Sequence, residues 1–322
     1  MEETDMNTNK YYCSAFNSDS SETVAYNNPR FPAYVRYGFL SSYPDYTAIS
    51  HWHADLEFIL IKKGKMVYNV NGELIELPTN CGIMVNSRQL HYGFSTEYGE
   101  CEFICILLST ELLRGNEWFY QNYIETVTEN SPIPYLYLDC GTDETVLNTL
   151  DKIYTSFGND PETPAAYFEL IENFALIMRI LYGRLNASHR TPAKESSELT
   201  ALRNIITYIE EHYQERITLE DIALSGSCCK SKCSLLFKKY LRDTPITYIT
   251  KLRLRKSLGA LLDPDKSITD VAYENGFCGS SYYCETFKKF YGMSPLAYRK
   301  SRYPDCCPAA EDGRVIASFV NL

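Results

Sequence analysis

The sequence of 322 residues lacks any long hydrophobic run. No apolar stretch approaches the roughly 18 residues that a membrane-spanning helix needs, so we expect no membrane partner. The first residues, Met-Glu-Glu-Thr-Asp-Met-Asn, are acidic and polar, unlike the basic and apolar start of a secretory signal. We therefore expect a cytoplasmic protein, long enough for two domains.

The twelve cysteines lack the spacing of a zinc finger. The adjacent pairs at 228–229 and 306–307 do not have the separation of two zinc ligands, and the other cysteines are scattered. In a reducing compartment we expect small buried hydrophobic residues and some exposed thiols. A redox-sensing role is the alternative.

An overall excess of basic charge is also lacking, since the formal net charge is −10. This negative net charge alone would argue against binding to nucleic acid, but the distribution of charge along the chain does not. Residues 196–304 carry 17 Lys and Arg against 12 Asp and Glu, a local balance of +5, and the remainder carries 14 against 29, or −15. A mildly basic C-terminal region on an acidic body is compatible with DNA binding, because affinity for phosphate depends on local charge.

Residues 31–109 show the pattern of short β-strands. Strands are predicted at 56–61, 82–86 and 101–108, and a hairpin at 66–77, where Asn71-Gly72 supplies the two positive φ angles of a type I′ turn. Many short strands at close spacing favour a sandwich or a barrel. Residues 1–30, rich in Asn, Ser, Thr and Tyr, have no periodicity, and we expect a loose arm.

From residue 143 onward the apolar residues recur with a helical period, which predicts helices at 143–157 and 164–186. The second helix has two neighbouring apolar stripes, one of Phe168, Ile171, Ala175, Met178 and Tyr182 and one of Leu170, Phe174, Ile177 and Leu181. This face is wide enough for both the core of its own domain and a partner subunit. We therefore expect a homodimer.

One segment near the C-terminus occurs twice, at residues 217–245 and again at residues 268–295. Each copy is predicted to form a short helix, a turn of about four residues and a second helix that ends in Phe-Lys-Lys. This is the layout of a helix-turn-helix, whose second helix enters the DNA major groove. The repeat therefore predicts binding to double-stranded DNA.

The second copy carries the more specific pattern. It contains Ile268, Val271-Ala272 and Gly276-Phe277, then Tyr282-Tyr283, Phe287-Lys288-Lys289, Gly292, Ser294-Pro295 and Tyr298-Arg299. Because of this pattern, residues 199–302 resemble the DNA-binding domain of the AraC/XylS family of bacterial transcriptional regulators. Gly276 suits the turn, Phe277, Tyr283 and Phe287 suit a core, and Ser294 suits the N-cap before Pro295. A long helix at 245–262 would join the two units and fix their separation near one DNA turn.

The resemblance also implies which residues face DNA. In the first recognition helix they are Lys230, Ser231, Lys232, Ser234 and Leu235, and in the second Gly279, Ser280, Ser281, Tyr282, Cys284 and Glu285. Leu235 and Glu285 depart from the family, in which a basic residue is common at both places. Leucine can contact a thymine methyl group, and glutamate can accept a hydrogen bond from cytosine or repel the phosphate backbone.

A second resemblance lies in the N-terminal region. His51-Trp-His53-Ala-Asp-Leu-Glu57 followed by Gly64, and the stretch 78–91 with Gly82, resemble the two motifs of a cupin barrel. In metal-binding cupins the matching residues, His51, His53, Glu57 and His91, would converge on one divalent ion, and alternation on one strand would place the first three on the same side. The ion would be Fe, Mn, Ni or Zn.

In AraC-type sensor barrels such histidines often line a ligand pocket. We therefore assign His51, His53, Glu57 and His91, with Trp52 and Tyr92, to effector binding, and a metal at the first four remains the alternative. The neighbouring aromatic residues, which also include Tyr46 and Phe58, would suit stacking on a sugar or a small aromatic compound.

Together the resemblances imply a two-domain α+β protein, with a cupin-like β-barrel and flanking helices followed by an all-α domain in which a long helix joins two helix-turn-helix units. The expected parts are an arm (1–30), an effector-sensing barrel (31–140), a helical dimerisation segment (141–187), a linker (188–197), the DNA-binding domain (198–303) and a tail (304–322).

The expected function is a sequence-specific transcriptional regulator that responds to a small-molecule effector, such as a sugar, bound in the barrel, and that is not itself an enzyme. RNA polymerase would be a further partner of an activator. The alternatives are a metal-dependent cupin enzyme with an accessory DNA-binding domain and a purely scaffolding protein.

Overall fold

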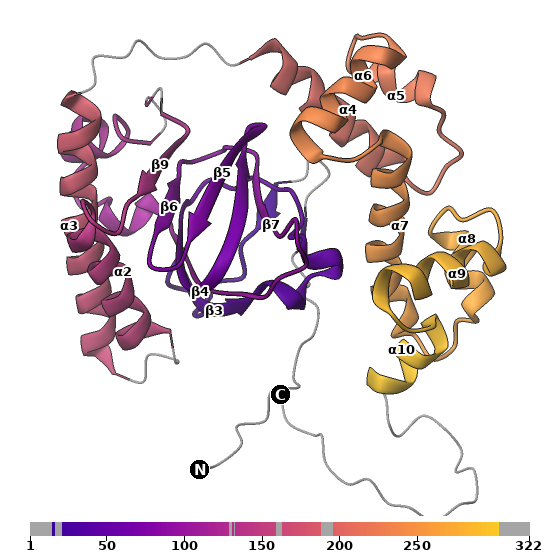
Figure 1. Ribbon diagram of the computed structural model, residues 1–322, viewed down its shortest axis with the longest axis horizontal. Coiled ribbons are helices and arrows are strands. Elements are labelled where there is room, and N and C mark those ends of the chain that lie inside the picture. Colours follow the sequence, from indigo (N-terminus) through magenta and orange to yellow (C-terminus); the bar gives the residue numbers. More distant parts are fainter. Residues whose placement is uncertain are drawn as a thin grey trace, which may run out of the picture. The chain divides into compact units, whose positions relative to one another are not determined.

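The computed structural model describes residues 15–16, 21–128, 131, 133–158, 163–187 and 196–302 (Figure 1). These residues form two compact units. The first comprises the described residues up to Glu211 and those from Thr218 to Pro245, and the second those from His212 to Ile217 and from Ile246 onward. Most of the predicted linker (188–197) and all of the tail (304–322) lie outside the described residues. None of the described helices is both long and apolar enough to cross a bilayer.

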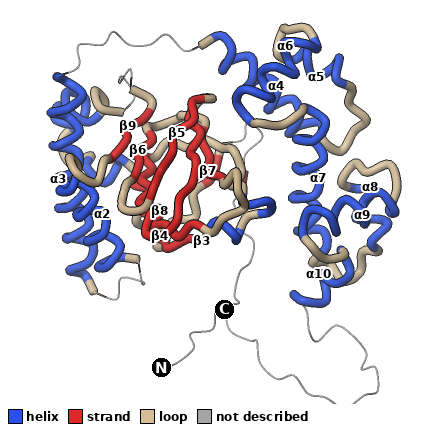
Figure 2. The backbone as a smooth tube through the Cα atoms, viewed as in Figure 1, coloured by secondary structure: helices blue, strands red, loops and turns tan. Residues whose placement is uncertain are grey.

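An antiparallel barrel dominates the first unit (Figure 2). Its strands are β3 (Ala33–Phe39), β4 (Leu56–Val70), β5 (Glu73–Pro78), β6 (Gly82–Val85), β7 (His91–Phe94), β8 (Cys101–Leu108) and β9 (Tyr135–Leu138). One layer has the order β3-β8-β4-β6-β9, and the other half of β4 pairs with β5 and β7. The predicted hairpin is confirmed, since Asn71 and Gly72 have φ angles of 51° and 85°.

The strands predicted at 56–61 and within 66–70 are two halves of one strand, β4, which carries an irregularity between Ile61 and Lys63. Before this bulge, odd-numbered residues such as Ile59 and Ile61 face the interior of the barrel, and even-numbered residues such as Phe58 pack against the helices. Beyond it, the even-numbered residues Met66, Tyr68 and Val70 face the interior. The bulge therefore changes which side chains point inward.

Two helices cover one face of the barrel, α2 (Glu144–Phe157) and α3 (Pro164–Ala187) (Figure 1). Both predicted helices are confirmed. Leu170, Phe174, Ile177 and Leu181 are fully buried in the core shared with the barrel. In the other predicted stripe Met178 is buried, but Phe168 is 76% exposed. Shorter elements complete this layer: η3 (Thr110–Leu113), α1 (Glu117–Phe119) and η4 (Tyr120–Ile124).

Part of the predicted arm is ordered against the barrel, so a loose arm over the whole of 1–30 is wrong. β1 (Ala15–Phe16) pairs with β2 (Glu22–Thr23), and Ser21 forms a bridge to Trp52. The side chain of Glu22 is buried and ion-paired with His51. A buried carboxylate is costly unless it is paired with an opposite charge. The ion pair between Glu22 and His51 therefore holds the segment around Glu22 against the barrel.

The first helix-turn-helix follows α4 (Ser197–His212) and consists of α5 (Leu219–Ser225) and α6 (Lys230–Leu236), which continues as a π-helical turn, η5 (Phe237–Leu241). A capping box of Thr218 and Asp221 starts α5. The four residues between α5 and α6 match the predicted turn. Cys233, Leu236 and Phe237 are buried, at the spacing of one helix face.

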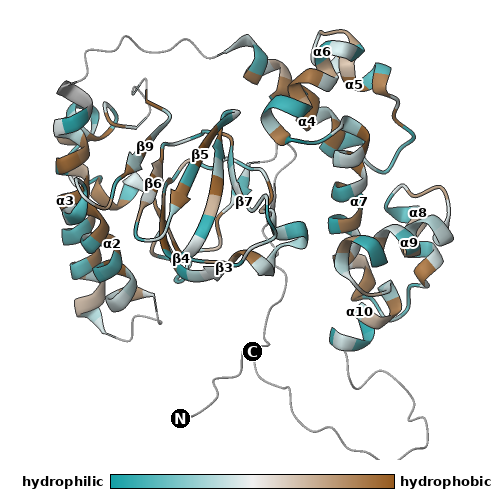
Figure 3. Ribbon diagram, in the orientation of Figure 1, coloured by the Kyte–Doolittle hydropathy of each residue, from teal (hydrophilic) through white to brown (hydrophobic). Residues whose placement is uncertain are grey.

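The second helix-turn-helix has the same design. Helix α7 (Pro245–Leu261) leads to α8 (Ile268–Glu274), α9 (Ser280–Tyr291) and α10 (Pro295–Arg302). Phe277, Tyr283 and Phe287 are buried, as predicted, and Val271 and Ala272 are buried as well. Hydrophobic segments alternate with hydrophilic ones along these helices (Figure 3). The Ala297 N–H donates to Ser294 Oγ at 3.2 Å, which confirms this N-cap.

Gly276 is required at its turn for two reasons. Its φ of 79° lies in the left-handed region, and a Cβ atom would lie 2.6 Å from the carbonyl oxygen of Tyr213. Arg253 holds the same segment, because its Nε donates to Tyr213 O at 2.7 Å and its guanidinium also donates to Glu215 O at 2.7 Å. Residues 212–217 are thereby joined to the second unit.

Candidate functional site

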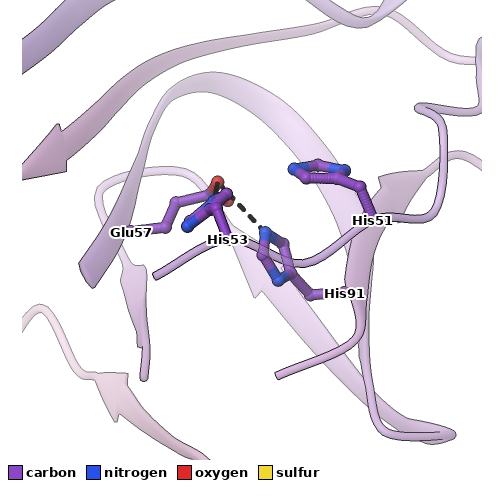
Figure 4. Close-up of side chains that lie close together, drawn as sticks. All are labelled: His51, His53, Glu57 and His91. Carbon is purple, nitrogen blue, oxygen red and sulfur yellow. Dashed lines mark hydrogen bonds and ion pairs between the residues drawn. The ribbon is translucent and has the colours of Figure 1, made fainter. Parts of the chain in front are cut away.

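A cluster of three histidines and one glutamate lies inside the barrel (Figure 4). One potential ligand atom from each of His51, His53, Glu57 and His91 lies within 4.8 Å of those of the other three. Glu57 is at the centre, because the Nε2 atoms of His53 and His91 both lie 3.2 Å from its Oε2. The four residues predicted to converge are therefore brought together.

We expected His51, His53 and Glu57 to converge because they would lie on the same side of one strand, and this reason is only partly right. Glu57 is on β4, but the chain bends at residues 54–55, so His51 and His53 precede the strand. Their segment is held by other bonds: His51 forms a bridge to His91, the Arg88 N–H donates to His53 O at 2.7 Å, and Ser87 Oγ donates to Ala54 O at 2.7 Å. The prediction of one strand for all three is wrong.

Backbone carbonyl groups fix the orientation of each imidazole ring. The Nδ1 atoms of His51, His53 and His91 lie 2.7, 3.0 and 2.8 Å from the carbonyl oxygens of Ile49, Asp55 and Gln89, respectively. A carbonyl oxygen can only accept, so Nδ1 carries the proton in each ring. Each Nε2 is thereby directed toward a carboxylate.

Two residues of the cluster were not predicted from the sequence. Glu22 Oε2 lies 3.1 Å from His51 Nε2, and the Tyr68 hydroxyl donates a hydrogen bond to Glu57 Oε1. Tyr68 is eleven residues from Glu57, an odd separation that would place the two on opposite faces of a regular strand. The bulge in β4 reverses this alternation and brings both inside.

Charge is distributed unequally within the cluster. Burial lowers the pKa of His51, but the Glu22 carboxylate, with smaller contributions from Glu57 and the Ile49 carbonyl group, outweighs burial and raises this pKa to about 9. Burial opposes ionisation of Glu57, yet His91 and His53 hold the pKa of this carboxyl well below its usual range. Burial also lowers the pKa of His91. Glu57 is therefore a buried carboxylate that stays ionised at neutral pH.

The predicted aromatic residues do not join this cluster. His91 pairs with Val70, whose side chain faces the interior, so the next residue, Tyr92, faces the other side, where Asn69 Nδ2 donates to its hydroxyl at 3.4 Å. Trp52 is buried, but it stands between His51 and His53 and has no ring contact with them among the described residues. Phe58 packs in the core shared with α2 and α3, and only Tyr46 lies against the interior core.

The residues predicted to face DNA lie on the solvent side of the two recognition helices. In α6 the side chains of Lys230, Ser231, Lys232, Ser234 and Leu235 are exposed. At α9 those of Ser281, Tyr282 and Glu285 are exposed, and Gly279, Ser280 and Cys284 are partly exposed. The opposite side of each helix is buried in the core, so each helix presents one solvent-exposed face.

The lysines of α6 already have acidic partners within the first unit. Lys230 Nζ lies 3.1 Å from Glu220 Oε2. Glu198 accepts from both Lys232 and Lys239, the latter at 2.8 Å, and from the Tyr240 hydroxyl at 3.1 Å. These hydrogen bonds lower the pKa of Glu198 to about 2. A phosphate group would have to compete with Glu198 for these lysines.

Comparison with known proteins identifies both parts of the chain. Residues 34–166 match an AraC-like ligand binding domain, and residues 227–301 match a helix-turn-helix domain. The uncharacterized HTH-type transcriptional regulator YdeC of Bacillus subtilis (strain 168) is 30% identical over 253 residues, which cover 78% of this chain and 85% of that protein. The melibiose operon regulatory protein of Escherichia coli (strain K12) is 23% identical over 303 residues, or 92% and 96% of the two chains.

Among solved structures, ToxT from Vibrio cholerae O395 is 14% identical, with a TM-score of 0.41 and coverage of 83% of this chain and 97% of that one. The relatives in sequence are transcriptional regulators and not enzymes, so the alternative of a cupin enzyme is not supported. The chain belongs to the AraC family of helix-turn-helix transcriptional regulators, with an N-terminal ligand-binding domain and a C-terminal DNA-binding domain.

Proposed function

We propose that the effector of this regulator binds inside the barrel beside Glu57, and that its binding changes the affinity of the helix-turn-helix units for promoter DNA. The observation that carries this proposal is a buried, ionised carboxylate among imidazoles and a tyrosine hydroxyl in an otherwise apolar interior. A few polar groups in an apolar surrounding are typical of small-molecule sites. The cytoplasm, where promoter DNA is found, is the proposed compartment.

A sugar is the proposed class of effector. A carboxylate accepts hydrogen bonds from hydroxyl groups, and imidazole and phenol groups can both donate and accept, so the cluster matches a polyhydroxylated ligand. The name of the melibiose operon regulatory protein, one of the relatives, points to the same class.

This proposal is tested with a fluorescent DNA duplex from the region upstream of the gene. We expect one sugar of a panel to change the anisotropy titration, and Glu57→Gln to abolish this response while DNA binding without sugar is retained. Glu76→Gln, an exposed carboxylate on β5, is the matched control and should respond as the wild type does. A normal response of Glu57→Gln would contradict the proposed position of the site.

A divalent cation in the same cluster is a second candidate, and one contact favours it. The Nε2 atoms of His53 and His91 both lie 3.2 Å from Glu57 Oε2. A cation could replace the protons between these atoms, and the donor set of three imidazoles and a carboxylate suits Zn, Fe, Mn or Ni. His51, His53, Glu57 and His91 would hold the ion, which when bound would attract an anionic or hydroxyl group of the effector.

Elemental analysis of protein purified without a chelator tests the cation. We expect the wild type to contain one metal equivalent more than His53→Ala. Equal contents in the two proteins would exclude the cation and leave the sugar site to be tested by the anisotropy experiment.

We further propose that two subunits associate through α3. Leu170, Phe174 and Ile177 are used by the core of the subunit itself, whereas Phe168 on the neighbouring stripe is 76% exposed. A homodimer would bring two DNA-binding domains to two half-sites and raise the affinity. Where the promoter is activated, RNA polymerase is the proposed partner of the bound dimer, which in vitro transcription with purified components would test.

Sedimentation measures the association of subunits. We expect Phe168→Asp to shift the protein from dimer to monomer. Tyr98→Asp, which changes a 65% exposed aromatic residue away from α3, is the control and should remain dimeric. Dimers in both variants would assign the interface to another surface.

A further inference from the structure

A second group of potential metal ligands lies at the end of the pair β6–β9, apart from the histidine cluster. It consists of Cys81, Asp139 and Cys140, and one ligand atom from each lies within 4.8 Å of the other two. Cys81 is buried, Asp139 is partly exposed and Cys140 is exposed. A small cation could therefore reach the group from solvent.

The fold holds these residues together from both sides. Gly82 on β6 pairs with Leu138 on β9, so the next residues outward, Cys81 and Asp139, face each other where the ladder ends. Cys140 follows directly, in the segment that leads to α2. Its sulfur atom lies within 4.8 Å of the Cys81 sulfur.

The backbone on the Cys81 side is fixed by hydrogen bonds to β4. The Ile61 N–H donates to Cys81 O at 3.0 Å, and the Asn80 N–H donates to Ile61 O at 2.8 Å. The Cys81 N–H in turn donates to Pro78 O at 3.1 Å, which closes the turn from β5 to β6. The position of the Cys81 sulfur therefore follows from the barrel itself.

The Asp139 side is fixed by a reciprocal cap. Asp139 Oδ1 accepts from the N–H groups of Gly141 at 2.8 Å and Thr142 at 3.2 Å, and the Asp139 N–H donates to Asp143 Oδ2 at 2.9 Å. Asp143 is ion-paired with Arg184 of α3. Among the described residues no hydrogen bond involves Asp139 Oδ2, so this oxygen is available as a ligand.

We infer that Cys81, Cys140 and Asp139 form a binding site for a thiophilic divalent cation such as Zn²⁺, at the junction of β6, β9 and the start of α2. Two sulfurs and one carboxylate oxygen are ligands that Zn²⁺ accepts, and solvent would supply the fourth position. Ligand atoms on one tetrahedral zinc ion are roughly 3.5–4 Å apart. Small side-chain rotations would therefore suffice to close the group around the ion.

The bound cation would connect the turn after β5 with the segment that begins α2. Both thiols would lose a proton when they coordinate the metal, so binding would weaken at low pH. This site is independent of the effector site, because it shares no residue with the histidine cluster and lies on different segments of the chain.

Cadmium is the probe, because its thiolate complexes absorb in the ultraviolet. The full-length protein is reduced and freed of metal, and is then titrated with Cd²⁺ while this charge-transfer absorption is recorded. The histidine cluster contains no sulfur and is silent in the experiment. Cys228 and Cys233 are also neighbouring thiols, but they have no third ligand within reach among the described residues. Cys228→Ser is therefore the matched control.

We expect the wild type and Cys228→Ser to bind one Cd²⁺ with the same thiolate absorption. Cys140→Ser, at an exposed position that tolerates serine, should weaken this binding by at least about 10-fold, and Asp139→Asn should weaken it while some thiolate absorption remains. DNA binding by these variants should be unchanged. Undiminished cadmium binding in Cys140→Ser would overturn the inference.

Discussion

Replacing Glu22 by glutamine would remove the carboxylate that lies 3.1 Å from His51 Nε2 in the buried cluster. Glu22, with smaller contributions from Glu57 and the Ile49 carbonyl group, raises the pKa of His51 from its ordinary 6.5 to about 9 against the opposing effect of burial. At about 1.4 kcal/mol for each tenfold change in proton affinity, this difference corresponds to about 3 kcal/mol. We therefore expect Glu22→Gln to lower the free energy of unfolding by up to about this amount near pH 6.

The dependence on pH follows from the direction of the change in pKa. The folded state binds the His51 proton more tightly than the unfolded state does. This stabilisation is therefore fully present below the ordinary pKa of about 6.5, and it is lost as the pH rises through about 9. The wild type and Glu22→Gln should differ most near pH 6 and least near pH 10.

Urea unfolding of chelator-treated protein measures this difference. The two tryptophans, Trp52 and Trp118, both belong to the N-terminal part of the chain, so their fluorescence reports on this part alone. Glu76→Gln is the control for loss of a carboxylate at an exposed position and should change little at any pH. A loss in Glu22→Gln that is equal at pH 6 and pH 10 would refute the ion pair as its cause.

Three further predictions concern the DNA-binding domain. Lys230→Ala and Lys232→Ala should each reduce the slope of log affinity against log salt by about 1 if each lysine neutralises one phosphate, whereas Ser280→Ala and Ser281→Ala should alter base preference in a competition with variant duplexes. Glu198→Gln should release Lys232 and Lys239 from their ion pairs and strengthen DNA binding by up to about fivefold at low salt, as measured by fluorescence anisotropy. Unchanged affinity would mean that neither lysine contacts phosphate. Tyr283→Phe removes the hydrogen bond to Ser257 Oγ at 3.0 Å and should lower the unfolding free energy of the second unit by about 1 kcal/mol in urea, while base preference is retained.

The helix-turn-helix units could be predicted well because their signals are local. Gly276 is needed at a left-handed turn and Ser294 at an N-cap, and each position depends on residues a few places away. The hairpin at Asn71-Gly72 was predicted for the same reason. Such features follow from backbone sterics and local hydrogen bonds.

Features that depend on distant parts of the chain were missed. The polar stretch after Ile61 in β4 resembles a loop, but it is an exposed part of one long strand, with Gly64 at a φ of 79°. The bulge there brings Tyr68 to Glu57. No local sequence pattern predicts that the side chains pointing into the barrel change from odd-numbered to even-numbered residues at this place. Glu22 reaches His51 from a segment without periodicity, so only the folded chain reveals this ion pair.

The claim that the two recognition helices read neighbouring major grooves is tested most directly by hydroxyl-radical footprinting of the upstream duplex. We predict two protected patches per subunit on one face of the DNA, one helical turn or about 10 base pairs apart. The double variant Lys230→Ala/Lys232→Ala should weaken one patch, and Ser281→Glu on α9 should weaken the other. A single patch per subunit, or two patches that every variant leaves intact, would contradict the assignment of α6 and α9 as a pair of DNA-reading helices.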